Sequence, residues 1–164
     1  VLDCFCGNGE MYKNCYKNNK YLGLDKNKVH NAKICKITDN LKFVKCNDIS
    51  NFNVFDLDDY GSPWKLFYAI LKKGGRGKFF LTDGSILKMK MNQKPSKIIS
   101  AIEKIPKNMK IYGLSRFYEE IFINMLTLAE KKYNVKIENV CFCKNKLKTV
   151  YYWFFIVKNS RQFD

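Results

Sequence analysis

The chain has 164 residues, which is enough for one domain with a sizeable core. It carries 30 lysine and arginine residues against 15 acidic ones, a formal net charge of +15. Such an excess indicates a polyanionic partner, because lysines displace counterions from phosphates; a lysine-rich composition without a binding role is the alternative. No apolar run approaches 18 residues, which excludes a membrane-spanning helix from the sequence pattern. Seven scattered cysteines indicate reduced thiols in a cytoplasmic protein rather than a disulfide framework.

Short apolar runs, most of them ending in an acidic residue, recur through the first half of the chain. Their length and their bounding polar residues are typical of buried strands. We therefore predict strands at 1–5, 21–25, 42–48, 53–59 and 78–84. Helical spacing of apolar residues lies between or after these runs and predicts helices over 9–19, 63–74, around 98–102, and over 117–133.

The last part of the chain has two strand-like runs, 135–142 and 149–157, with a short turn around 144–146. They predict an antiparallel hairpin. Alternation of strands and helices before the hairpin favours a mostly parallel sheet with helices on both faces. We expect one α/β domain of Rossmann-like type, because no repeat or linker interrupts the pattern.

Acidic residues stand at the ends of the predicted strands. Asp3 is followed by Gly7 and Gly9, and Asp25 and Asp48 end the next two predicted strands. Ligands of open parallel sheets bind beyond the carboxyl ends of the strands, where glycines let the backbone approach closely. Asp25 lies at the spacing from the glycines that suits a carboxylate for two ribose hydroxyls, and Asp48 is placed to accept from an adenine amino group.

The glycine loop argues against a dinucleotide. The third glycine of a G-x-G-x-x-G motif is replaced by Tyr12. The carboxylate of Asp3 would repel a pyrophosphate but suits the ammonium group of an amino acid. S-adenosylmethionine has both an adenosine end and an amino-acid end, and it is the expected cofactor.

Four segments in order resemble the motifs of class I S-adenosylmethionine-dependent methyltransferases. DCFCGNG (3–9) is similar to their first motif, YLGLD (21–25) to the second and KCNDI (45–49) to the third. FDLDDYGSP (55–63) resembles the fourth motif, and is most similar to the D-P-F-G-S-P signature of the tRNA guanine-N2 dimethyltransferase family. This chain has Asp59 where that family has proline.

The resemblance implies the fold of that class and a set of site residues. In it, the glycine loop holds the methionine part, Asp25 the ribose, and Asp48 with Ile49 the adenine. The implied cofactor contacts are Asp3, Phe5, Cys6, Gly7, Asn8, Gly9, Asp25, Lys26, Asp48, Ile49, Asp58 and Gly61. The resemblance also implies that a segment preceding Val1 is missing, because a helix normally comes before the first strand in this fold.

The expected reaction is methylation of an exocyclic base nitrogen, with RNA favoured over DNA. Such a nitrogen is a weak nucleophile, and a carboxylate that accepts its N–H would stabilise the developing positive charge. Asp58 is the first candidate for this role and Asp59 the second, while Tyr60 would stack on the base. No metal is expected. The alternatives are a DNA amino-methyltransferase, a small-molecule methyltransferase, and a catalytically degenerate nucleic-acid-binding module of the same fold.

A lysine cluster follows the fifth predicted strand. Lys88, Lys90, Lys94 and Lys97 are candidate phosphate contacts for a nucleic acid. A solvated basic surface is the alternative reading of the same residues.

Overall fold

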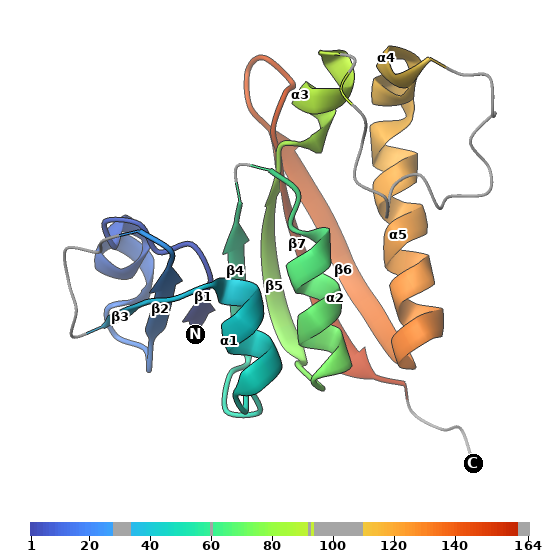
Figure 1. Ribbon diagram of the computed structural model, residues 1–164. Helices are drawn as coiled ribbons and strands as arrows, with labels where there is room; N and C mark the ends of the chain where they lie inside the picture. The colour runs from blue at the N-terminus through green and yellow to red at the C-terminus, as the bar shows by residue number, and fades with distance from the viewer. Residues whose placement is uncertain (28–33, 60, 92, 94–109, 161–164) are drawn as a thin grey trace.

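The computed structural model describes residues 1–27, 34–59, 61–91, 93 and 110–160 (Figure 1). In this part of the chain seven strands form one sheet in the order β3-β2-β1-β4-β5-β7-β6. The strands are β1 (Leu2–Asp3), β2 (Leu22–Asp25), β3 (Cys35–Ile37), β4 (Val54–Asp58), β5 (Gly77–Asp83), β6 (Val135–Lys144) and β7 (Tyr151–Asn159).

The sheet is parallel from β3 to β5 and antiparallel at its C-terminal end. β7 runs antiparallel to both β5 and β6, and it lies between them. The C-terminal hairpin is therefore inserted, with β6 at the edge and β7 inside the sheet. The predicted α/β architecture with a mostly parallel sheet and an antiparallel hairpin is confirmed.

The main helices α1, α2 and α5 cover one face of the sheet (Figure 1). The described helices are α1 (Asn40–Cys46), α2 (Trp64–Lys72), α3 (Ser85–Lys90), α4 (Ile111–Leu114) and α5 (Tyr118–Tyr133), with a π-helical turn η1 (Tyr12–Tyr16) and a 3-10 turn η3 (Ser115–Phe117). The turn η1 lies against the other face, because the Tyr16 hydroxyl reaches Asp56, whose neighbours Phe55 and Leu57 point into the core. The helix predicted around 98–102 lies outside the described residues.

The core is aromatic and lies between the sheet and helices α2 and α5. Phe122 of α5 stacks on Trp153 of β7 with ring centroids 3.6 Å apart and the planes 6° from parallel. Phe79 and Phe155 stack across β5 and β7 at 5.6 Å, and Phe67 of α2 meets both edge to face. The apolar stripe predicted for 117–133 is core packing, since its central residues are fully buried.

The strand predicted at 42–48 is wrong, because this segment is helix α1. Asp39 caps the helix, with one of its carboxylate oxygens accepting from the Lys42 N–H at 2.8 Å. Val44 is the residue that α1 buries completely, so a helical stripe and not an alternating strand pattern explains the apolar positions. The third strand is the three-residue β3, which is too short to stand out in the sequence.

This correction moves Asp48 and Ile49 to the other end of the sheet. They lie in the loop that leads from α1 into the beginning of β4. Ile49 is a core residue, 1% exposed. Asp48 is exposed; hydrogen bonds from Ser50 and the nearby Lys73 lower the pKa of its carboxyl group. Asp48 therefore does not reach the carboxyl ends of the strands, where it was expected to hold adenine.

Candidate cofactor site and active site

The loop after β1 turns sharply through two glycines. Gly7 and Gly9 have φ angles of 47° and 77°, the left-handed region that glycine adopts at little cost. The Gly9 N–H donates to the Cys6 carbonyl at 2.7 Å, and the Cys6 N–H donates to Leu24 of the neighbouring strand at 3.1 Å. The loop is thus a compact turn that is tied to β2 and exposes Gly7 and Asn8.

Asp25 joins this loop to the end of β2. One of its carboxylate oxygens accepts from the Gly7 N–H at 3.0 Å, and the other accepts from the Asn27 N–H at 2.8 Å. Each oxygen keeps a further acceptor position. Sequence reasoning placed Asp25 at the ribose, and the structure brings it directly beside the glycine loop.

Asp3 lies under the loop, where it is only 1% exposed. Its carboxylate accepts from the Phe5 N–H at 3.1 Å and from the Tyr21 hydroxyl at 2.7 Å. Burial raises its pKa, and the nearby carboxylates of Asp58 and Asp25 raise it further, against the effect of these hydrogen bonds. Because both oxygens accept hydrogen bonds from the chain itself, Asp3 stabilises the conformation of the loop.

A second buried carboxylate, Asp56 on β4, was not singled out by sequence reasoning. The Tyr16 hydroxyl donates to it at 2.8 Å, and the residue is 4% exposed. Burial raises the pKa of Asp56 to about 7, with Asp3 as the next contribution. Strand alternation was the available signal, because it places Asp56 and Asp58 on the face opposite Phe55 and Leu57.

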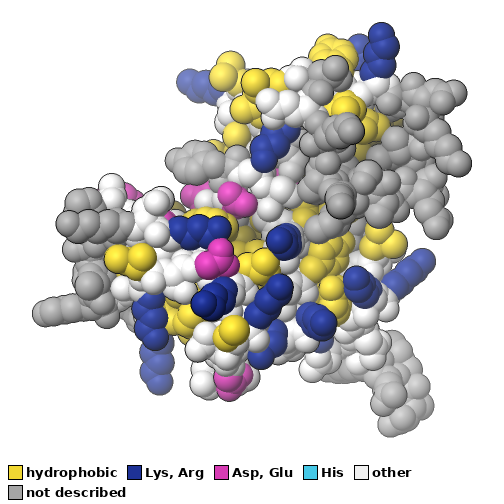
Figure 2. All heavy atoms as spheres, viewed as in Figure 1, with side chains coloured by type: hydrophobic (Ala, Val, Ile, Leu, Met, Phe, Trp, Pro, Cys, Tyr) yellow, Lys and Arg dark blue, Asp and Glu magenta, His cyan; other side chains and the backbone are white. Residues whose placement is uncertain are grey.

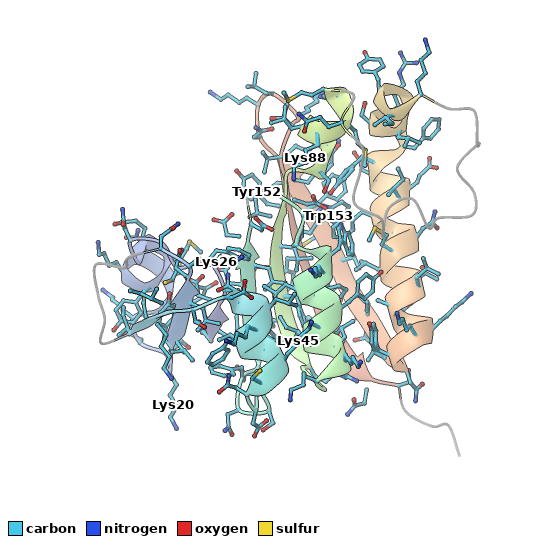
Figure 3. The ribbon with its side chains drawn as sticks, in the orientation of Figure 1. Lys20, Lys26, Lys45, Lys88, Tyr152 and Trp153 are labelled. Atoms are coloured by element: carbon cyan, nitrogen blue, oxygen red, sulfur yellow. The ribbon has the colours of Figure 1, made fainter. Side chains whose placement is uncertain are left out.

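The end of β3 supplies the acidic position that the sequence reading gave to Asp48. Lys26 lies just after β2 (Figure 3), and its ammonium group pairs with the carboxylate of Asp39, which follows the neighbouring strand β3, at 2.9 Å. The hydrogen bond from Lys26 and that from the Lys42 N–H lower the pKa of Asp39. The next residue, Asn40, is buried and donates through its amide to the Cys4 carbonyl. The signal that the sequence analysis missed is that Asp39 both follows a strand and caps a helix.

Two loops meet at the ends of β4 and β5. The Gly61 carbonyl accepts from the Gly84 N–H at 3.1 Å, and the carboxylate of Asp59 accepts from the Gly61 N–H at 3.0 Å. Asp58 is exposed at the end of β4, and its carboxylate accepts no hydrogen bond from the described residues. The two candidate acids therefore differ, since Asp59 is turned back onto its own loop. Tyr60 lies outside the described residues.

Lys88 reaches this junction from α3. A Cβ at Gly61 would lie 3.3 Å from the Lys88 Nζ and 3.4 Å from an oxygen of Asp59. Lys90 is on the same helix, whereas Lys94 and Lys97 lie outside the described residues. The face of α1 and α2 carries many lysines as well (Figure 2), so the basic surface extends beyond the predicted cluster.

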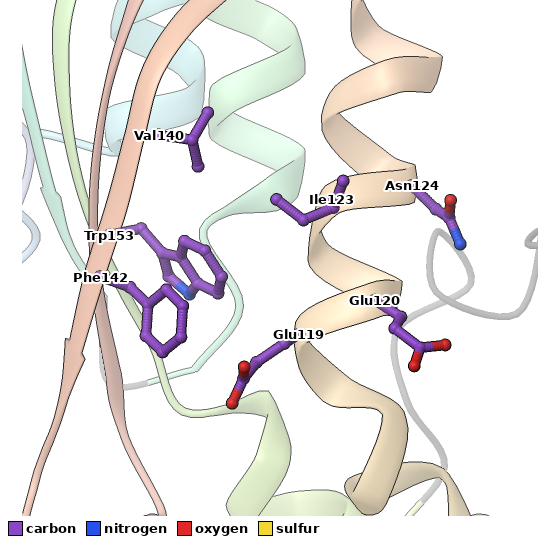
Figure 4. Close-up of a pocket in the computed structure, with 7 residues that line it drawn as sticks. All are labelled: Glu119, Glu120, Ile123, Asn124, Val140, Phe142 and Trp153. Carbon is purple, nitrogen blue, oxygen red and sulfur yellow. The ribbon is translucent and has the colours of Figure 1, made fainter.

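A separate hollow of about 490 Å³ lies between α5 and the last two strands (Figure 4). Its lining includes Glu119, Glu120, Phe142 and Trp153. None of the glycine-loop residues or the acids at the ends of β2 and β4 lines it, so it is distinct from the candidate site. Among the described helices, none is long and apolar enough to cross a membrane.

The arrangement of these loops places the candidate residues at the point where the strand order reverses. β1 lies between β2 and β4, and the loops after all three strands open at the same edge. In open α/β sheets this is where ligands bind. The structure thus brings together the glycine loop, Asp25, Lys26, Asp58 and Gly61, and leaves Asp48 and Ile49 outside.

Neither a protein-family profile nor a curated protein sequence matches this chain. A solved structure does: M. jannaschii TYW2 in complex with AdoMet, with a TM-score of 0.55 and 14% sequence identity. The match covers 96% of this chain and 67% of the TYW2 chain. At this identity the likeness concerns the fold alone, and the chain has the Rossmann-like α/β fold found in this AdoMet-bound protein.

Proposed function

We propose that the protein is an S-adenosylmethionine-dependent methyltransferase that acts on a nucleic acid. The observation that carries the proposal is the position of Asp25, whose carboxylate is fixed by Gly7 and Asn27 where β1 and β2 end. A fixed carboxylate beside a glycine turn suits a ligand that has vicinal hydroxyls and a second part that packs closely against the loop backbone. The AdoMet bound by a protein of the same fold supports the choice of cofactor.

The remaining residues at this edge fit the other parts of the cofactor. The exposed backbone at Gly7 and Asn8 is available to the methionine part. Asp39, which follows β3, takes the place of Asp48 as the acid proposed to accept from the adenine amino group. Bound S-adenosylmethionine supplies a methyl group on a positively charged sulfur. The chain then has to exclude water and hold the nucleophile in line with that group.

Asp58 is the proposed proton-accepting group. An exocyclic amine of a base delocalises its lone pair into the ring, and a carboxylate that accepts its N–H favours attack through nitrogen. Asp58 is exposed, it ends β4, and its charge lies close enough to act on Asp3 and Asp56. Asp59 is the weaker candidate, because its carboxylate already accepts from Gly61.

The nucleic acid is proposed to be RNA. The net charge of +15 supports a polyanionic substrate, and the Asp-x-Tyr-Gly-Ser-Pro segment at 58–63 supports RNA through its resemblance to the tRNA-modifying signature. We further propose that the chain is one methyltransferase domain and that it works in the cytoplasm. The alternative that the structure favours most is a binding module without catalysis, because Asp59 replaces the proline of the signature and folds back on the loop.

Calorimetry with S-adenosylmethionine tests the cofactor. We expect Asp25→Ala to weaken binding strongly, whereas Asp48→Ala removes an exposed carboxylate at the opposite end of the sheet and leaves binding unchanged. Equal affinities for Asp25→Ala and the parent protein would contradict the proposal.

Transfer of a labelled methyl group to bulk RNA, bulk DNA and a metabolite extract then tests the substrate. Label in nucleosides of RNA, methylated on an exocyclic nitrogen, is expected. Cofactor and RNA binding without any transfer would instead identify a binding module.

A further inference from the structure

Helix α3 and the β6–β7 hairpin form one basic surface, although they are far apart in the sequence. The Lys90 ammonium group donates to the Lys148 carbonyl at 3.0 Å and so fastens the helix to the hairpin. Both elements rise at the end of the sheet where the candidate site lies (Figure 1). The lysine cluster predicted on α3 therefore continues onto a second element.

The hairpin turn is held in one conformation by Asn145. Its side-chain oxygen accepts from the N–H groups of Thr149 and Val150 at 2.8 and 3.2 Å, and its amide donates to the Thr149 hydroxyl at 2.9 Å. The Lys148 N–H closes the turn onto the Asn145 carbonyl at 2.9 Å. A turn fixed in this way presents Lys146 and Lys148 from a backbone that is already ordered, so binding costs only the ordering of their side chains.

The lysines of this surface are available for phosphates. Lys88, Lys90, Lys146 and Lys148 are exposed, and none of them forms an ion pair with an acid among the described residues. The nearby Glu119 is already paired with Lys144 at 2.5 Å. Lys88 starts the series beside Gly61 and Asp59, so the basic surface begins at the candidate site.

An aromatic row on β5 and β7 lies on the sheet face away from α2 and α5, and its first β7 member, Tyr152, follows Lys148 by four residues. Tyr152, at the start of β7, is 45% exposed and Phe80 is 37% exposed. The Phe80 ring contacts that of Phe154 with the centroids 5.0 Å apart. Aromatic rings next to lysines are a stacking platform for the bases of a single strand.

Strand register connects this platform to the proposed catalytic carboxylate. Asp58 lies opposite Thr82 on β5, and Thr82 lies opposite Tyr152 on β7. With strands about 4.8 Å apart, the Cα atoms of Asp58 and Tyr152 are about 10 Å apart on one face of the sheet. A base stacked on Tyr152 therefore belongs to a nucleotide close to the one that is methylated.

We propose that this surface, formed by α3, the hairpin turn and Tyr152, binds the single-stranded RNA that flanks the target nucleotide. The lysines contact its phosphates and Tyr152 stacks on a flanking base. The inference rests on the proposed function and adds to it a substrate class, RNA that is unpaired beside the target. Charge complementarity and continuity with the candidate site favour RNA over a second copy of the chain as the occupant.

Fluorescence anisotropy with a labelled single-stranded RNA of mixed sequence tests the proposal on the full chain. The double variant Lys146→Gln/Lys148→Gln is expected to bind on the order of 10-fold more weakly, with a log–log salt slope smaller by about 1.4, the value for two lost phosphate contacts on a single strand. The matched control is Lys131→Gln/Lys132→Gln, which removes the same charge from the far end of α5. Equal losses in the two double variants would overturn the proposal.

Variants of Tyr152 provide a second test, of the proposed stacking on a base. Tyr152→Ala is expected to weaken single-strand binding about 5- to 100-fold and duplex binding much less, whereas Tyr152→Phe retains affinity because it keeps the ring. Unchanged affinity of Tyr152→Ala would remove the stacking role. A dimer of the parent protein that Tyr152→Ala dissociates, measured by sedimentation, would assign the face to a second copy and overturn the proposal.

Calorimetry with S-adenosylmethionine on the same variants separates this inference from the proposed function. All variants are expected to keep the cofactor affinity of the parent. If the parent protein binds the cofactor but no RNA, the docking surface is overturned and the cofactor assignment stands. If the parent protein binds neither, the proposed function itself is contradicted.

Discussion

Asp3 and Asp56 lie opposite each other on the adjacent parallel strands β1 and β4, and both are buried. Each is held by a tyrosine hydroxyl, Asp3 by Tyr21 and Asp56 by Tyr16. The rings of Tyr16 and Tyr21 are themselves stacked, with centroids 6.1 Å apart. Two carboxylates with so little access to water resist full ionisation, and the pair supports the glycine loop directly above it.

The stability of the protein is expected to depend on pH through Asp56. Its pKa is about 7 in the folded protein, against an ordinary value of 3.8. As the pH rises, Asp56 therefore loses its proton at a lower pH in the unfolded chain than in the folded protein. The free energy of unfolding then falls between about pH 4 and about pH 7, by up to about 4 kcal/mol. Above and below this range the contribution is constant.

Asp56→Asn removes this ionisation and keeps an oxygen for Tyr16. Denaturant unfolding of the two proteins from pH 4 to pH 8 is the measurement. The parent and the variant should be similar near pH 4, and the parent should be the less stable one above pH 7. Parallel stability curves would show that Asp56 ionises normally.

Gly23 on β2 leaves no room for a side chain beneath the glycine loop. A Cβ there would lie 2.7 Å from both the Cys35 Sγ and the Cys6 Cβ. We expect Gly23→Ala to destabilise the fold by about 1–3 kcal/mol and to weaken cofactor binding, because the Cys6 backbone has to move. Thermal unfolding and calorimetry would measure the two effects. The control is Gly74→Ala after helix α2, away from the candidate site, which meets no atom within 4 Å and strains only its own φ of 83°.

The two acids at the end of β4 should separate kinetically. Asp58→Ala is expected to keep cofactor affinity while lowering turnover about 10²- to 10⁴-fold, the range for positioned acid–base groups. Asp59→Ala should mainly loosen the loop, because it removes the hydrogen bond from the Gly61 N–H. Single-turnover methyl transfer with saturating cofactor measures both. If only Asp59→Ala loses turnover, the catalytic role passes to Asp59.

The free energy of unfolding is expected to depend on the hydrogen bond between Trp64 and the buried Asp83 at the end of β5. The indole N–H of Trp64 donates to its carboxylate at 2.9 Å, and the Ser85 N–H donates at 2.8 Å. Trp64→Phe deprives a fully buried carboxylate of one donor, at an expected cost of about 1–3 kcal/mol beyond the lost packing. A double-mutant cycle with Asp83→Leu, which has a similar shape but no acceptor for the indole, isolates this coupling. Strictly additive effects would show that the bond contributes nothing.

The prediction of the third strand shows where the sequence misled. KFVKCND has β-branched and aromatic residues and ends in an acid, which resembles the runs at 21–25 and 53–59. Asp39 and its hydrogen bond to Lys42 decide for a helix, and the real strand has only three residues. A strand that short carries too few alternating positions to give a pattern, because its stability comes from pairing with β2.

The sequence by itself determined the strand-ending acids, the glycine loop and the alternation of strands and helices, because these depend on local backbone geometry and periodicity. It placed Asp25 and Asp58 at the correct edge of the sheet. Only the tertiary structure decided that Asp39 and not Asp48 is the acid that follows the third strand, that Asp56 is buried against Asp3, and that the hairpin meets α3. These relationships depend on pairing between segments distant in the chain, which periodicity within a segment does not encode.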